Sequence, residues 1–325
     1  MKRILISLIA LVSIFPIMAS AEDKPSAEAL LHQMDEASHS LNYELSYILV
    51  KKNSIEPFMY RHSHTKDMTL SHLVYLSGSM REVIRRNDEI SYLEQGSKPF
   101  SIQSEAIVAP IIPLLHKNVA ELNQYYDFIS MGRAREAGSP TQVIRIVSKD
   151  GARYSYVVWI DERSKLPLRT DLVSRDGDII EQYRVVSYTV NDQITEFMKK
   201  RLGTVELPKV LKIPAATNEA AMWSVNWIPQ GFKKINFNRY RLSMNQRSVE
   251  SKMFSDGLFN FSVYISEADK LSHKEQLVTQ GRRSLHSYIK GEYEISVVGD
   301  IPTVTAKRIA NSVVFDSSDV NVKEK

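Results

Sequence analysis

Residues 142–191 read QVIRIVSKDGARYSYVVWIDERSKLPLRTDLVSRDGDIIEQYRVVSYTVN, and this stretch decides the fold. It predicts consecutive β-strands, because short runs rich in Val, Ile and Tyr are separated by turn residues. Asp150-Gly151 and Asp176-Gly177 predict two-residue hairpin loops, since glycine adopts the positive φ that a type I′ turn requires. Leu166-Pro167 closes a longer turn between them, where proline fixes φ. We therefore expect an antiparallel meander.

The faces of this meander bear on function. A two-residue loop at Asp150-Gly151 places Arg145 opposite Tyr156 and Val143 opposite Val158. Because strand side chains alternate, one face then carries four aromatic or apolar residues: Tyr154, Tyr156, Val158 and Ile160. The other face is predicted to carry four more: Ile144, Ile146, Val157 and Trp159. A strand pair that is apolar on both faces either lies between two layers or wraps a cavity, so the first set is our candidate lining of a lipid cavity.

Residues 1–21 have the features of a secretory signal peptide. A basic start (Lys2, Arg3) precedes an apolar run over residues 4–15, and Ala19-Ser20-Ala21 matches the small-x-small cleavage pattern. The run is shorter than the roughly 20 residues of a membrane span, so export is expected and an uncleaved anchor is the alternative. The chain has no cysteine, which excludes disulfides and a lipoprotein anchor. We therefore predict a periplasmic protein.

The mature chain is long enough for two domains of about 100–200 residues each. Four segments are predicted after the signal peptide: a large β domain (22–202), a linker (203–221), a smaller α+β domain (222–316) and a disordered tail (317–325). The linker contains Pro208 and Pro214 and has little periodicity. Without Lys2 and Arg3 the formal charge falls from +4 to +2, so the charge indicates no nucleic-acid partner.

Helices are predicted at both ends of the mature chain. Residues 26–41 have apolar positions at helical spacing after the N-cap candidate Ser26. Pro302 is predicted to open a final helix with the apolar positions Val304, Ala306, Ile309, Ala310 and Val313.

An apolar segment lies at residues 107–122. Pro110 and Pro113 prevent a single regular helix across it. It either closes over the sheet as a lid or fills the core as a plug.

Known catalytic motifs are absent from the sequence, which predicts neither an enzyme nor a cofactor. His62 and His64 share a strand face, but no third ligand at a telling spacing supports a metal site. Asp161-Glu162 beside Lys165 is read as a solvated turn rather than as an acid/base pair.

Candidate partner contacts come from the small domain. Arg282 and Arg283 interrupt a segment of alternating apolar residues, and arginine is favoured at recognition surfaces. Tyr264 is added because Phe259, Phe261 and Val263 are predicted to share the opposite, core face. These three residues, Arg282, Arg283 and Tyr264, are the predicted partner-binding set.

Several long segments resemble one family, in order along the mature chain. They include LNYELSYILV, REVIRRNDEISYLEQGSKPFSI, VIRIVSKDGARYSYVVWIDERSKLPLRTDL, WIPQGF, SDGLFNFSV and TAKRIANSVVF. They are similar to the RseB/MucB family, periplasmic regulators of the sigma-E envelope stress response. The resemblance implies a large domain like LolA and LolB, a curved antiparallel half-barrel with helices on its concave side, and a smaller C-terminal α+β domain.

The resemblance also implies a function. Such proteins bind the periplasmic domain of the anti-sigma factor RseA and shield it from site-1 proteolysis by DegS. Lipid-like signals, lipopolysaccharide or another acylated ligand, are expected to release them. The alternative is a periplasmic carrier of lipids or lipoproteins without a regulatory partner, and an unrecognised hydrolase is a third class. The sequence leaves the oligomeric state open, a homo-oligomer included.

Overall fold

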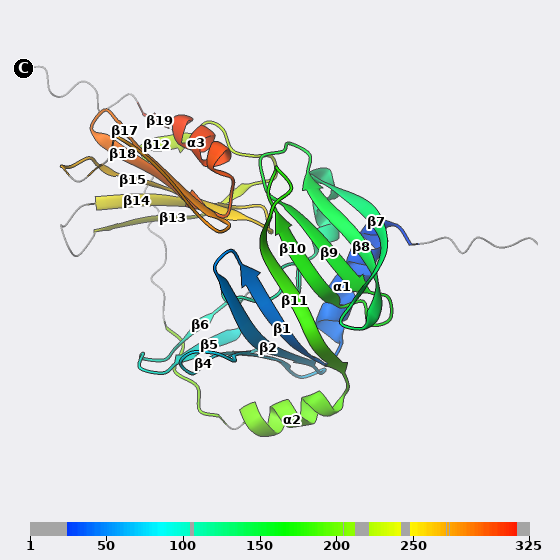
Figure 1. Ribbon diagram of the computed structural model, residues 1–325. Coiled ribbons are helices and arrows are strands. Elements are labelled where there is room, and N and C mark those ends of the chain that lie inside the picture. The colour runs from blue at the N-terminus through cyan, green and yellow to red at the C-terminus, as the bar shows by residue number, and fades with distance from the viewer. Residues whose placement is uncertain are drawn as a thin grey trace, which may run out of the picture.

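The computed structural model describes residues 25–104, 107–203, 205–211, 221–241, 248–270, 272 and 274–316. The predicted signal peptide and tail, and part of the predicted linker, lie outside these residues. The described strands form an eleven-stranded sheet, a six-stranded sheet and a two-stranded pair. A large curved sheet lies beside a smaller domain (Figure 1). The expected fold class, a curved antiparallel sheet with a smaller α+β domain, is confirmed.

The large sheet is antiparallel throughout and has the order β6-β5-β4-β3-β2-β1-β11-β10-β9-β8-β7. Its strands are β1 (Tyr43–Lys51), β2 (Ser54–His64), β3 (Thr69–Tyr75), β4 (Arg81–Arg86), β5 (Glu89–Glu94), β6 (Phe100–Gln103), β7 (Tyr126–Glu136), β8 (Ser139–Ser148), β9 (Ser155–Asp161), β10 (Pro167–Val173) and β11 (Ile179–Val190). The predicted meander is β8 to β11, and β1 pairs with both β2 and β11 to join the two halves of the sheet.

The register of β8 and β9 differs from the prediction by one residue. Ile144 pairs with Val158 and Ile146 with Tyr156. Residues 149–154 all lie in the loop, where the Asp150 carboxylate accepts a hydrogen bond from the Ala152 amide at 3.0 Å. A one-residue shift moves every side chain to the other face. Ile144 and Ile146 therefore share a face with Val158 and Tyr156, and their predicted grouping with Val157 and Trp159 was wrong.

The predicted turn at Asp176-Gly177 is also longer than two residues. β10 ends at Val173 and β11 begins at Ile179, so residues 174–178 form the turn. Gly177 has the positive φ, 92°, that the sequence predicted for it. The glycine marks the turn correctly, but it does not set the loop length.

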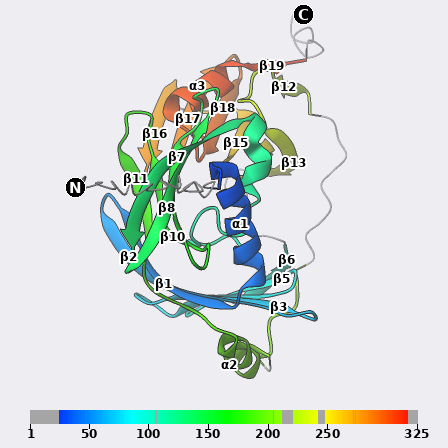
Figure 2. The ribbon, with the colours of Figure 1, turned by 90° about the vertical axis from the view of Figure 1, so that its right-hand side faces the viewer.

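The concave side of the large sheet is filled by its own chain. α1 (Ala27–Ser40) lies within the curve of the sheet (Figure 2). Ser26 caps this helix as predicted, because its hydroxyl accepts a hydrogen bond from the Ala29 amide at 3.1 Å. The irregular segment 107–118 and the short 3-10 helix η1 (Val119–Gln124) pack beside it. Buried side chains anchor both: Leu30, Leu31, Met34, Ile112, Leu114, Leu115 and Val119. Of the two predicted roles, segment 107–122 has that of a plug.

The opposite, convex side of the large sheet carries α2 (Gln193–Leu202), which packs Met198 and Leu202 on Leu70 and Ile84. Residues 205–211 then follow the sheet edge. The Ser101 carbonyl of β6 accepts a hydrogen bond from the Leu211 amide at 2.8 Å. The first part of the predicted linker thus covers this edge.

The small domain is a six-stranded antiparallel sheet of order β13-β14-β15-β18-β17-β16 with α3 (Thr303–Asn311) packed on one face. The strands are β13 (Lys233–Arg241), β14 (Ser248–Ser255), β15 (Asn260–Glu267), β16 (Glu275–Gln280), β17 (Arg283–Lys290) and β18 (Tyr293–Gly299). β12 (Trp223–Val225) pairs with β19 (Val313–Phe315). Two predicted apolar positions of the last helix were wrong: Val304 is 67% exposed, and Val313 lies in β19, because the helix ends at Asn311.

Candidate functional site

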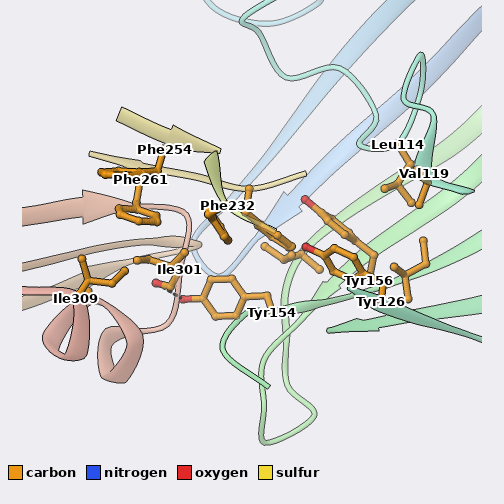
Figure 3. Close-up of a cluster of buried hydrophobic side chains, with 14 of the residues drawn as sticks. Leu114, Val119, Tyr126, Tyr154, Tyr156, Phe232, Phe254, Phe261, Ile301 and Ile309 are labelled. Atoms are coloured by element: carbon orange, nitrogen blue, oxygen red, sulfur yellow. Dashed lines mark hydrogen bonds between the residues drawn. The ribbon is translucent and has the colours of Figure 1, made fainter. Parts of the chain in front are cut away.

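The two domains share one apolar cluster. Tyr156 of β9 stacks on Phe259 of the small domain, with ring centroids 5.2 Å apart and an interplanar angle of 12°. Tyr154 meets the same phenyl ring edge-on and donates a hydrogen bond to the Ile301 carbonyl at 3.3 Å (Figure 3). The cluster extends from α1 of the large domain to α3 of the small domain. Burial of aromatic side chains on both sides holds the domains in one arrangement.

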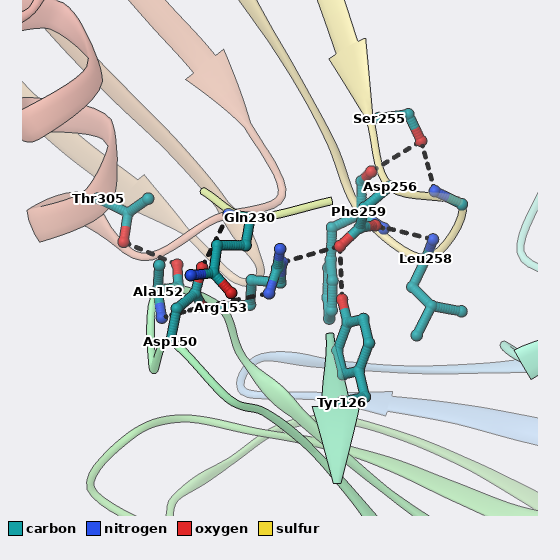
Figure 4. Close-up of polar contacts among 11 residues, drawn as sticks. Tyr126, Asp150, Ala152, Arg153, Gln230, Ser255, Asp256, Leu258, Phe259 and Thr305 are labelled. Atoms are coloured by element: carbon teal, nitrogen blue, oxygen red, sulfur yellow. Dashed lines mark hydrogen bonds and ion pairs between the residues drawn. The ribbon is translucent and has the colours of Figure 1, made fainter. Parts of the chain in front are cut away.

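A buried ionic network supports this interface. The Arg153 side chain is fully buried and lies 2.8 Å from Asp256 of the small domain and 3.1 Å from Asp150. Tyr126 donates a hydrogen bond to Asp256 at 2.5 Å (Figure 4). The guanidinium carbon is 5.1 Å from the ring centroid of Tyr126 and equally far from that of Phe232. Since a buried charge is tolerated only when it is paired, each domain needs the other at this point.

A cleft of about 840 Å³ opens beside this interface. This volume lies in the range of about 300–1,000 Å³ that is typical of ligand sites. Four parts of the chain form its walls: the β1–β2 hairpin, the plug segment, the strands β9 and β11 of the large sheet, and the small-domain turns. Its lining includes Leu49, Lys51, Lys52, Ile107, Pro110, Tyr156, Glu181, Tyr183, Leu258, Gln280, Arg282, Arg283 and Asp300. The cleft thus combines apolar side chains with several cations and two carboxylates.

Arg282 joins the two domains across this cleft. Its guanidinium lies 2.9 Å from Asp300 of the small domain and 3.8 Å from Glu181 of β11. Burial raises the pKa of Glu181. Burial also raises the pKa of the Tyr156 hydroxyl to about 12, so the phenol stays neutral. Arg283, by contrast, makes a looser ion pair with Asp300, at 3.7 Å. Its side chain is 65% exposed, so most of its guanidinium is accessible. The two neighbouring arginines therefore differ in role.

The predicted site residues fall in different places. Tyr156, Arg282 and Arg283 meet in the cleft, although they were assigned to two separate sites. Tyr154 is in the domain interface, and Val158 and Ile160 are fully buried in the core. Tyr264 is half-buried and lies on the face of β15 opposite Phe261 and Val263, as expected from alternation.

The sequence reading missed the network around Arg153. Asp256 caps its own turn by accepting hydrogen bonds from the Leu258 and Phe259 amides. Arg153 lies in the loop after Asp150-Gly151, where a solvated cation is the ordinary expectation. No local signal distinguishes a buried arginine in a loop, because its carboxylate partner comes from the other domain.

The remaining candidates have structural roles. His62 is buried and contacts the Ser71 hydroxyl, whereas His64 is exposed beside Thr69. Asp161 accepts two hydrogen bonds from Ser164, and Glu162 pairs with Arg133 at 2.5 Å. No group of three potential metal-ligating side chains occurs among the described residues.

A second hollow, of about 910 Å³, lies between α1 and the β9–β10 turn. Its lining has two carboxylates, Glu36 and Asp161, and two cations, Arg163 and Lys165. It lies within the large domain, and it contains none of the predicted site residues. The interdomain cleft is therefore the stronger candidate. Within the part of the chain that the structure describes, no helix is long and apolar enough to cross a membrane.

Two family models match the chain. Residues 26–210 match the MucB/RseB N-terminal domain, and residues 217–314 match the MucB/RseB C-terminal domain. The sigma-E factor regulatory protein RseB of Escherichia coli K12 is 42% identical over 301 residues, which cover 92% of this chain and 94% of that protein. The sigma factor AlgU regulatory protein MucB of Pseudomonas aeruginosa is 23% identical over 300 residues, 90% and 92% of the two chains.

A solved structure shares the fold. The complex structure of Pseudomonas aeruginosa MucA/MucB contains a chain that superposes with a TM-score of 0.71 at 20% identity, covering 90% of this chain and 99% of that one. MucB in complex with MucA(peri) gives a TM-score of 0.69, also at 20% identity, with 90% and 100% covered.

Proposed function

This chain belongs to the MucB/RseB family, and from that premise we propose that it is a periplasmic negative regulator of a sigma-E envelope stress response. Its partner is the periplasmic domain of an anti-sigma factor of the RseA and MucA type, which it shields from site-1 proteolysis by a protease of the DegS type. It acts by binding, not as an enzyme. The relatives' names and the MucA complexes support this proposal.

The observation that supports it best is the interdomain cleft. Its walls offer apolar surface from Ile107, Pro110 and Leu258, and its rim offers the exposed cations Lys52 and Arg283. A weakly structured chain segment with apolar and acidic residues is complementary to such a surface, because apolar anchors and arginine contacts dominate protein interfaces. Tyr264, on the outer face of the small sheet, is a second and separate proposed contact.

We further propose that lipopolysaccharide or another acylated anion releases the partner. Tyr156 lines the same cleft as Arg283, so acyl chains on the apolar wall and an anionic headgroup at the rim occupy the space of the partner segment. The two ligands then compete for one site. A lipid carrier without a regulatory partner is the alternative function.

The charge reversal Arg283→Glu tests partner binding. The variant is expected to bind the purified periplasmic domain of the anti-sigma factor at least about tenfold more weakly in a calorimetric titration, or about 1.4 kcal/mol. Arg283 is preferred over Arg282, because reversing Arg282 places a third carboxylate beside Asp300 and Glu181. Arg201→Glu, in the exposed last turn of α2, is the control. Equal affinities for the two variants would place the contact elsewhere.

Lipid release is tested on the preformed complex. Lipopolysaccharide is expected to displace the labelled partner in proportion to its concentration, and fully deacylated lipopolysaccharide is expected to have little effect. Lipid binding with the partner still attached would contradict competition at one cleft. Capture of lipoproteins alone from a periplasmic extract would favour the carrier function.

A further inference from the structure

β16 is an edge strand of the small sheet. Within the described residues, it pairs with β17 alone. All six of its side chains are exposed, including the apolar Leu277 and Val278 at 54% and 44%. An exposed edge offers its unpaired backbone groups to another strand, and proteins usually cover or interrupt such edges.

The pairing register identifies which backbone groups face outward. The Ile289 amide donates to the Lys274 carbonyl at 3.3 Å, so these two residues form a hydrogen-bonded pair. In an antiparallel ladder, such pairs recur at every second residue. Gln276, Val278 and Gln280 therefore bond to β17, and Glu275, Leu277 and Thr279 direct their amides and carbonyls away from it.

A partly apolar shelf lies beside this edge. Glu275 on β16 is 2.8 Å from Lys307 of α3, so this side of the helix lies next to the strand. Val304 precedes Lys307 by three residues, which places it on the same side of α3, and it is 67% exposed. Leu277 is on the same face of β16 as Glu275. An added strand would thus find apolar side chains next to its hydrogen-bonding partner.

The large sheet provides a contrast. At its β6 edge the chain covers itself, because residues 208–211 run along the strand and Ser101 bonds to both Pro208 and Leu211. The β16 edge is left open by comparison. The C-terminal end of β16 lies at the cleft, since Gln280 and the following residues Gly281, Arg282 and Arg283 line the cleft wall. A chain segment leaving the cleft therefore passes directly onto β16.

We propose that β16 is a docking edge on which the anti-sigma factor adds an extended segment as a seventh strand. This inference rests on the proposed function, because the segment is the continuation of the one in the cleft. The segment has apolar residues at alternate positions, which pack on Leu277 and Val304. An acidic residue is expected at the end of the segment near the exposed Arg283.

The test removes one outward amide. Thr279→Pro deletes a donor that β17 does not use, and proline is tolerated on edge strands. This variant is expected to bind the anti-sigma-factor domain about fivefold more weakly, in line with the loss of one hydrogen bond. Leu277→Lys, which alters the shelf and keeps the backbone, is expected to weaken binding to a similar extent. Gln276→Ala, on the opposite face of the strand, is the control.

Hydrogen exchange provides a second measurement on the unaltered protein. The amides of Leu277 and Thr279 are expected to exchange fast in the free chain and at least about tenfold more slowly in the complex. Unchanged exchange would overturn the proposal. The proposal would also fail if Thr279→Pro changed the oligomeric mass of the free chain but not its affinity for the partner. That result would assign the β16 edge to contact with a second copy of this chain. If Arg283→Glu weakens binding and Thr279→Pro does not, the cleft assignment stands and the added strand fails.

Discussion

The concave side of the large sheet and the cleft between the domains differ in what fills them. Beneath the plug segment, beside Tyr60 and Arg85, the remaining space is about 150 Å³, whereas the cleft encloses about 840 Å³. The first is below the size of ordinary ligand sites and the second is within it. Beneath the plug segment, the curved sheet thus leaves no cavity of ligand size. The domain interface leaves a larger space, which lies between the plug segment, the large sheet and the turns of the small domain.

The polar side chains of the two regions also differ, in whether they bond to other protein groups or face solvent. On the concave side, the His116 ring nitrogen contacts the Tyr60 and Tyr43 hydroxyls at 2.9 and 3.2 Å, so the plug segment is held by specific polar contacts. His116 and Leu114 both have positive φ, 59° and 72°, a conformation that only a constraining environment maintains. In the cleft, Arg283 and Lys52 face solvent instead. The polar groups of the concave side are thus bonded to one another, whereas the cleft has exposed charges that can contact a ligand.

The largest effect is expected when the domain interface is broken. Arg153→Met removes a buried cation and leaves Asp150 and Asp256 without their partner, which is expected to cost about 3–5 kcal/mol of unfolding free energy. Urea denaturation measures the loss. Arg133→Met is the control: the Arg133 side chain is 63% exposed and pairs with Glu162 at the surface. This change is expected to lower the unfolding free energy by less than about 1 kcal/mol. Equal losses would mean that the network does not hold the domains together.

Acid is expected to weaken the concave side next. Burial, followed by the charges of His39, Arg85 and His64, lowers the pKa of His62 from 6.5 to about 4. Between these two pH values, His62 is protonated in the unfolded chain and neutral in the folded chain. The stability is complete above pH 6.5 and falls as the pH drops toward 4, by about 3 kcal/mol from this residue alone.

The pH dependence of the urea midpoint measures this loss. His62→Gln is expected to flatten the slope between pH 6.5 and 4, and His32→Gln, at an exposed position of α1, is expected to leave it unchanged. Burial lowers the pKa of His116 as well, so part of the slope is expected to persist in the His62 variant. A slope that does not respond to His62→Gln would contradict the assignment.

The smallest effect is expected on the outer face of the small sheet. Tyr264→Ala removes a half-buried side chain that does not line the cleft. Its unfolding free energy is expected to fall by less than about 1 kcal/mol, and its affinity for the anti-sigma-factor domain by at most about threefold. The titration used for Arg283→Glu measures the second value. A loss as large as that of Arg283→Glu would extend the partner surface across the small sheet.

Local sequence was sufficient for many elements of this protein. The strands of the meander, the cap at Ser26, the turn glycines and the prolines that keep residues 107–122 irregular all follow from short-range rules. β3 and β13 were not recognised. β13 reads KKINFNRYR and has only half-buried or exposed side chains, so its strand pattern is weak. Segment similarity alone indicated the family and the curved sheet.

The tertiary structure decided the rest. The loop at residues 149–154 is longer than its Asp-Gly signal predicts, because Asp150 and Arg153 bond to groups of the small domain, and this sets the register of β8 against β9. The same long-range contacts bring Tyr156 and Arg283 into one cleft, although 127 positions separate them in the sequence. Periodicity reports only which side chains are apolar within one strand or helix. Which of them pack together, and where space is left, depends on partners that come from distant parts of the chain.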